Sequence, residues 1–142
     1  MTLLELAAVV FIIGLLGVMA ATRYGNSTIA DTDAQGFARR LTHDCSQARR
    51  RAIATGDNHL VRFTVSGGQA SQYALYRRVG GSPNLVDQAH PVPANVTVTT
   101  SATDVEFTFT GEALASYTVT IQAPDRTWTV TVPQATGKAF VQ

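Results

Sequence analysis

The sequence predicts an α+β protein with a helical N-terminal third followed by β-strands. Three observations support this fold class. Residues 1–24 are a nearly unbroken apolar run, apolar residues between 34 and 55 recur at three- and four-residue spacing, and the pattern after Gly56 alternates with period two. A chain of 142 residues has room for one domain beside the apolar segment.

The apolar segment carries one carboxylate, Glu5, close to its start. No charged or strongly polar side chain follows from Leu6 to Ala21. A helix over residues 1–22 would be roughly 33 Å long, close to the bilayer core of about 30 Å. An acid at the centre of a membrane helix costs about 2.5 to 3.5 kcal/mol, and less near the end. We therefore expect a partner that neutralises Glu5.

Three explanations of this segment differ in how they treat Glu5. A cleaved signal peptide would need a basic n-region and an A-x-A cleavage site, and neither is evident. A simple membrane anchor accounts for the length but leaves the acid unexplained. If Met1 is the mature N-terminus, its α-amino group is a cation that Glu5 of a neighbouring, axially shifted subunit can pair.

The same segment resembles the N-terminal signature of the type IV pilin family. The residues that carry the resemblance are Thr2-Leu3-Leu4-Glu5-Leu6, followed by Val9, Val10, Ile12, Ile13, Gly14, Leu15 and Leu16. It implies cleavage of a leader by a prepilin peptidase just before Met1, methylation of the new amine, and transfer from the inner membrane into a helical filament. Two positions depart from the family pattern, because Met1 replaces the more usual Phe and Thr22 replaces a frequent Pro.

The pilin resemblance also implies which residues assemble the filament: Met1, Glu5, Leu6, Val9, Val10, Ile13, Gly14, Leu16 and Gly17. Each glycine weakens a helix by up to about 1 kcal/mol relative to Ala, which would permit local melting between Gly14 and Thr22. Alternatively the glycines allow neighbouring helices to pack closely. The sequence leaves both roles open.

Residues 34–55 predict an amphipathic helix that ends at Gly56. Its apolar face, which we expect to pack on the sheet, consists of Phe37, Leu41, Cys45, Ala48 and Ala52. Cys45 is the single cysteine, and we expect it to be a small buried residue. The helix is expected to bend or pause at Gly25–Thr28. The predicted division is an N-terminal helix at 1–56, with halves 1–24 and 25–56, and a β-domain at 57–142.

The opposite face of the amphipathic helix is basic, with Arg39, Arg40, Arg49, Arg50 and Arg51. A solvated or subunit-contacting face is the first interpretation. Nucleic-acid contact is the alternative, and it would require these arginines to form one exposed stripe with Arg77 and Arg78. The 11 basic and 10 acidic residues give a net charge of +1, so the whole chain is not attracted to nucleic acid.

The β-domain is predicted from alternating segments at 60–65, 73–78, 96–100, 105–110, 117–122 and 127–132. Gly67-Gly68 begins a hairpin connection, and 124–126 is a turn. Alternation with threonine places Val119, Ile121, Trp128, Val130 and Val132 on one buried face of an antiparallel sheet. Residues 80–84 and 90–95 are predicted surface loops, where binding specificity would lie.

A second resemblance extends over the rest of the chain. The segments Ala48–Ile53, Val105–Gly111, Trp128–Val132 and Gly137-Lys138 are similar to the GspH/FimT branch of pilin-like proteins. It implies the type IV pilin fold, a long helix packed by its second half on an antiparallel β-sheet domain. The branch includes minor pseudopilins of type II secretion systems and minor pilins that aid DNA uptake. Some DNA-binding members use an arginine in the C-terminal tail, which residues 137–142 lack.

An enzymatic function is not expected. His43, His59 and His90 lie in no metalloprotease, CxxC or nucleophile-elbow motif. His43, Asp44 and Cys45 are adjacent on a helix, so their side chains point about 100° apart and cannot converge. No cofactor and no metal are therefore expected.

The function predicted from the sequence is that of a structural subunit of a type IV pilus or pilus-like filament. Expected partners are further copies in a helical filament, other pilins or pseudopilins, the prepilin peptidase and the inner-membrane assembly machinery; nucleic acid is not an expected partner. The predicted location is the bacterial inner membrane, then an extracellular pilus, with cell adhesion as one use, or a periplasmic pseudopilus. The alternatives are a minor pseudopilin of a type II secretion system and a DNA-binding minor pilin.

Overall fold

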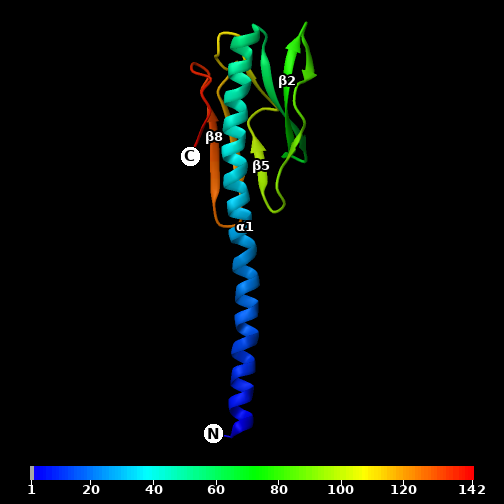
Figure 1. Cartoon of the computed structure of the whole chain (residues 1–142). Helices are drawn as coiled ribbons and strands as arrows, with labels where there is room; N and C mark the ends of the chain where they lie inside the picture. The colour runs from blue at the N-terminus through cyan, green and yellow to red at the C-terminus, as the bar shows by residue number, and fades with distance from the viewer. Residues whose placement is uncertain (1) are drawn as a thin grey trace.

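A computed structural model describes residues 2–142, with the backbone alone at residues 21–24 and 26. One helix, α1 (Leu3–Thr55), is followed within the described residues by nine strands. Figure 1 shows that the C-terminal part of α1 lies along the β-domain and that its N-terminal part projects beyond the domain as a stalk. We call residues 3–20 the lower half of α1 and residues 30–55 its upper half.

Helix α1 is continuous over 53 residues, about 80 Å at 1.5 Å per residue. It ends at Gly56, whose φ of 74° lies in the left-handed region that glycine adopts readily, and whose N–H donates to the Ala52 carbonyl at 3.0 Å. The helix does not pause at Gly25–Thr28, because one helical glycine costs only about 1 kcal/mol. The hydroxyl of Thr32 donates to the Thr28 carbonyl at 2.9 Å, so this polar side chain is satisfied inside the helix.

The strands form two antiparallel sheets. The first has the order β3-β2-β1-β6, with β4 also paired to β2, and the second has the order β5-β7-β8-β9. The strand bounds are β1 His59–Ser66, β2 Gln69–Val79, β3 Ser82–Leu85, β4 His90–Pro91, β5 Thr97–Thr100, β6 Asp104–Phe107, β7 Tyr117–Gln122, β8 Thr127–Val132 and β9 Phe140–Val141.

The six strands expected from the alternation correspond to β1, β2, β5, β6, β7 and β8. The strand expected at 105–110 is shorter, because β6 ends at Phe107 and the N–H of Thr108 donates to the Glu112 carbonyl instead. Phe109 follows in this turn and is 59% exposed. Strands β3, β4 and β9 lie in segments expected to be loop or tail, since two- and four-residue edge strands are too short to show a period.

One hydrophobic core joins α1 to both sheets. It includes Phe63 and Tyr73 of the first sheet and Ile121 and Val130 of the second, all less than 2% exposed. Tyr73 sits at the centre of an aromatic group, with its ring 5.5 Å from Phe37 and 5.8 Å from Phe63. The two sheets and the upper half of α1 therefore form one packed unit.

Candidate assembly surface

The lower half of α1 presents apolar side chains on all of its faces. The segment Leu3–Ala20 is long and apolar enough to cross a membrane, and none of it is buried inside the structure. Of the residues predicted to assemble the filament, the exposed ones are Glu5, Leu6, Val9, Val10, Ile13, Gly14, Leu16 and Gly17. Met1 lies outside the described residues. A helix that is apolar on every side needs a surrounding apolar environment, either lipid or other helices.

Glu5 stands at the third position of α1, at its N-terminal end. The Thr2 hydroxyl accepts from the Glu5 N–H, and the Glu5 carboxylate accepts from the Thr2 N–H, both at 3.4 Å. This is a capping box, in which the two residues satisfy amide groups that a helix start leaves unpaired. The carboxylate also lies at the positive end of the helix dipole. Glu5 therefore has a role within its own chain that the sequence analysis missed, although the T-x-x-E spacing indicates it.

The two glycines of the lower half have open space beside them. A Cβ built on Gly14 or Gly17 would meet no atom within 4 Å outside the local helix backbone. The backbone is helical at both positions and at Thr22, where local melting was considered. Within this one chain nothing packs against either glycine, so the close-packing role would involve another molecule.

The upper half of α1 contacts the sheets through small side chains. Phe37, Leu41, Cys45, Ala48 and Ala52 are all at most 6% exposed and belong to the core. The buried face also begins earlier than expected, with Ala30 and Ala34, and it includes Ala38 as well. Alanines let a sheet approach a helix closely, which explains why this face carries few large residues.

Polar contacts fix the position of α1 on the domain. The Tyr73 hydroxyl donates to the Asp44 carboxylate at 2.7 Å, and burial, together with this bond, raises the pKa of Tyr73. Burial likewise raises the pKa of the Cys45 thiol to about 12. At neutral pH Cys45 is therefore protonated and unreactive, as its position in the core implies.

The arginines of α1 do not act as one basic face. Arg49 is half-buried, and its Nε donates to the Gly111 carbonyl at 2.7 Å, which ties the helix to a loop 62 residues away in sequence. Arg39, Arg40 and Arg50 are exposed, whereas Arg51 is half-buried. The predicted set is thus divided between internal and surface positions.

Arg77 and Arg78, which the nucleic-acid interpretation needed, both form ion pairs inside the chain. Nε of Arg77 donates to Asp57 at 2.9 Å. Arg78 binds Glu106 through two hydrogen bonds of 2.9 and 2.8 Å and also donates to the Gly81 carbonyl. These contacts remove both arginines from the single exposed stripe that the nucleic-acid interpretation required.

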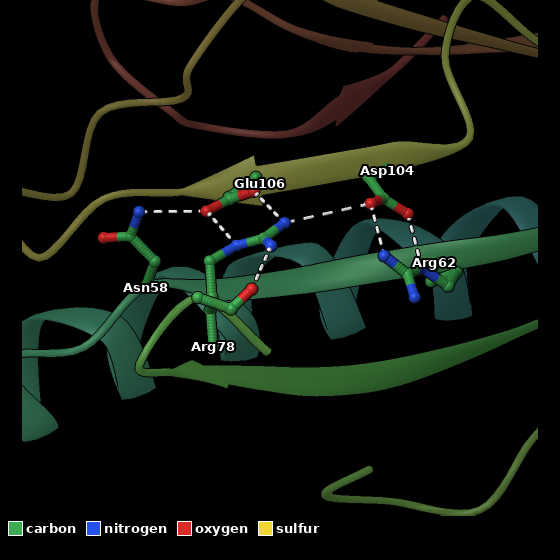
Figure 2. A network of polar contacts seen from close by, with 6 residues as sticks. Asn58, Arg62, Arg78, Asp104 and Glu106 are labelled. Carbon is green, nitrogen blue, oxygen red and sulfur yellow. Dashed lines mark hydrogen bonds and ion pairs between the residues drawn. The ribbon is translucent and has the colours of Figure 1, made fainter. Parts of the chain in front are cut away.

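A polar network on β1, β2 and β6 was also missed by the sequence analysis. Arg62 binds Asp104 with two hydrogen bonds of 2.7 Å, and Arg78 lies 3.9 Å from the same carboxylate (Figure 2). Glu106 is 5% exposed and also accepts from the Asn58 amide at 2.9 Å. In Figure 2 these side chains lie on the face of the sheet away from α1. The acids at 104 and 106 share a face by their spacing of two, which is the signal that could have revealed it.

The charges in this network stabilise one another. The hydrogen bonds from Arg62 lower the pKa of Asp104, and the bonds to Asp104 and Glu106 raise the pKa values of Arg62 and Arg78. Two bidentate pairs on three adjacent strands fix the register of β1, β2 and β6. The network is therefore explained as structural support for the β-domain.

The described residues hold no group of three or more His, Cys, Asp or Glu side chains that could bind a metal ion. His43 contacts Asp44 at 3.4 Å, His59 contacts the Asp57 carbonyl at 3.0 Å, and the ring of His90 lies 5.3 Å from that of Tyr73. Nε2 of His90 also lies 4.0 Å from the Asp44 carboxylate, so His43 and His90 both lie beside Asp44, whereas His59 is held in a separate local contact.

Residues 38–136 match the family model described as type II transport protein GspH. The chain belongs to the GspH family. This match confirms the resemblance to the GspH/FimT branch and covers the upper part of α1 with nearly all of the β-domain. No curated protein sequence matches this GspH-family chain.

Solved structures with the same fold include a minor pilin and a minor pseudopilin. The type IV minor pilin FimU of Pseudomonas aeruginosa is 16% identical, with a TM-score of 0.65 over 79% of this chain and 90% of FimU. The minor pseudopilin EpsH from the type 2 secretion system of Vibrio cholerae is 18% identical, with a TM-score of 0.61 over 80% of this chain and 95% of EpsH. The type IV pilin-like α+β fold is thereby confirmed. As a GspH-family protein, the chain is a pilus-like or pseudopilus subunit, and its family is one of structural subunits rather than enzymes.

Proposed function

We propose that this chain is a structural subunit of a type IV pilus or pilus-like filament, assembled through the lower half of α1. The observation that carries the proposal is an 18-residue apolar segment, unburied within the chain, with one carboxylate at its N-terminal end. Neighbouring helices would cover this surface in the filament, and lipid would cover it beforehand. Residues 57–142 face outward as the β-domain.

In the assembled state, Glu5 pairs with the α-amino group of Met1 of a neighbouring subunit. The capping box engages the Thr2 N–H through one carboxylate oxygen, Oε2, so the other oxygen has room for a second donor. A buried carboxylate and a buried ammonium each carry a large desolvation cost, which their mutual attraction offsets. Cleavage before Met1 by a prepilin peptidase would create the amine that this pairing requires.

The partners and location follow from the same assembly. The chain first resides in the bacterial inner membrane. The assembly machinery extracts it, and it then joins further copies and other pilins in an extracellular or periplasmic filament. Gly14 and Gly17 have open space beside them, which supports close packing of helices there. Phe37, Leu41, Cys45, Ala48 and Ala52 hold the β-domain on α1 while the lower half is surrounded by neighbours.

A minor subunit is the second candidate function. FimU is a type IV minor pilin and EpsH is a minor pseudopilin of a type 2 secretion system, so the two belong to different systems. A DNA-uptake role has weaker support, because Arg49, Arg77 and Arg78 form hydrogen bonds with other groups of the same chain.

Electron cryo-microscopy of filaments sheared from native cells, combined with mass spectrometry, tests the proposal. The chain as the bulk component, with Glu5 buried beside a neighbour's N-terminus, is the expected result. A trace amount supports the minor-subunit candidate. Absence from both pili and pseudopili would refute both candidates.

A further inference from the structure

A groove of about 540 Å³ opens at the upper end of the β-domain, where α1 ends. Its lining comes mainly from the C-terminal end of α1 and from the β2–β3 hairpin, two segments that Figure 1 shows at the same end of the β-domain. Its lining includes Arg51, His59, Arg77, Val79, Leu85 and Val86. Arg51 forms no ion pair with any described acid, whereas Arg77 pairs with Asp57. The groove thus combines positive charge with exposed apolar side chains, of which Leu85 is 60% exposed.

The lower end of the β-domain has the complementary character. Asp31 and Asp33 of α1 lie there with Asp125 of the β7–β8 turn, and the Asp125 N–H donates to Asp31 at 3.4 Å. None of these acids forms an ion pair with a described side chain, and one base, Arg126, lies beside them. Ile29, one helical turn from Asp33, is 62% exposed. This end therefore combines negative charge with an exposed apolar side chain.

We propose that the upper groove of one subunit binds the lower end of a second copy of this chain, with Arg51 facing Asp33 and Leu85 facing Ile29. The proposal rests on the proposed function, because a filament aligns the helices of its subunits. Opposite charge and exposed apolar residues at both surfaces argue for this occupant. The two surfaces differ and lie at opposite ends of the domain, so the contact is heterologous, and repeating it with an axial shift builds an open filament.

The contact joins a different pair of copies from the Glu5 contact. Along α1, Asp33 and Arg51 are about 27 Å apart at 1.5 Å per residue, whereas positions 1 and 5 are only four residues apart in sequence. Pairing Glu5 with a neighbour's N-terminal amine therefore needs a much smaller axial shift than placing Asp33 beside Arg51. Either contact can therefore form without the other.

Cysteine cross-linking in the full chain tests the contact. Ile29→Cys and Leu85→Cys are introduced together, and sheared filaments are treated with a bifunctional maleimide. Cys45 gives little background because it is buried. The expected result is a ladder of linked copies. The matched control joins Leu85→Cys with Val65→Cys, an exposed residue of the β1–β2 hairpin, and should give no ladder.

Charge exchange adds a second measurement. Arg51→Glu should lower the cross-linking yield about fivefold, and adding Asp33→Arg should restore it. Filaments that contain the chain and depend on Glu5 but give no ladder would overturn this inference and leave the proposed function intact. Links to a different pilin would replace the second copy with that partner. If the chain enters no filament, the proposed function and this inference both fall.

Discussion

Glu5 has two possible roles in this chain, and the substitutions Glu5→Gln and Glu5→Ala separate them. The capping box accepts Glu or Gln at this position, so Glu5→Gln keeps the hydrogen bonds between residues 2 and 5. Pairing with a neighbour's amine needs the negative charge, which both substitutions remove. If pairing dominates, Gln and Ala should behave alike. If capping dominates, Gln should behave like the natural residue.

The expected magnitudes differ enough to be distinguished. Removing one partner of a buried ion pair costs about 3 to 5 kcal/mol, because the other charge stays buried and unpaired. That corresponds to a loss of about 100-fold or more in the addition of each subunit. Losing only the interaction of a charge with the helix dipole costs about 0.3 to 1 kcal/mol, at most about fivefold. Glu5→Gln is therefore expected to abolish filaments rather than to reduce their yield a few-fold.

The assay is the yield of sheared filaments, normalised to the chain level in the inner membrane. Protease resistance of the β-domain serves as the folding control, since Glu5 lies in the first turn of α1 and the N-terminal part of α1 projects beyond that domain (Figure 1). Glu5→Gln cells with normal filaments, beside Glu5→Ala cells without them, would refute the charge-pairing argument and leave capping as the role of this residue.

Three further predictions concern the β-domain and use denaturant unfolding of the full chain in detergent, followed by fluorescence of its single tryptophan. Glu106→Gln should lower the unfolding free energy by about 2 kcal/mol, because a buried carboxylate that accepts two bonds from Arg78 loses its charge; an unchanged midpoint contradicts this. The lowered pKa of Asp104 stabilises the fold above the ordinary aspartate pKa of about 3.9, and this contribution is lost as pH falls through the lowered value. Asp104→Asn should therefore make the unfolding free energy depend less on pH in the acid range. An unchanged pH dependence argues against a stabilising Arg62–Asp104 ion pair. Gly137→Ala should cost at least about 1 to 2 kcal/mol, because φ is +57° and the new Cβ would collide with the Gly111 carbonyl oxygen; equal stability would exclude the strain.

Much of the fold could be predicted because its signals are local. The change from helical to two-residue periodicity at Gly56 coincides with the end of α1, and the threonine alternation corresponds to β7 and β8. The pause expected at Gly25–Thr28 is absent because the cost of one glycine is small against the cooperativity of a long helix. Whether the strands form one sheet or two depends on long-range pairing, which local patterns do not contain.

The candidate assembly surface could be predicted in part. An exposed apolar helix with an acid near its start is visible in sequence, and so is the family that this pattern indicates. The hydrogen bond of Arg49 could not be predicted, because its acceptor is the backbone carbonyl of Gly111, 62 residues away, and a backbone carbonyl has no side-chain signature. Arg77 and Arg78 looked like surface charge because their acids, Asp57 and Glu106, are 20 and 28 residues away in sequence and meet them only in the folded protein.

The two halves of α1 meet different requirements, which explains their different compositions. The upper half buries one face against two sheets and uses alanines where they approach, so its stability comes from within the chain. The lower half is apolar on every side and gains nothing from its own β-domain, so its burial requires lipid or other subunits. Folding of the domain and assembly of the filament are therefore separable along one helix. Substitutions at Glu5 should change assembly without changing the unfolding of the β-domain, whereas substitutions at Phe37 or Leu41 should unfold the domain first.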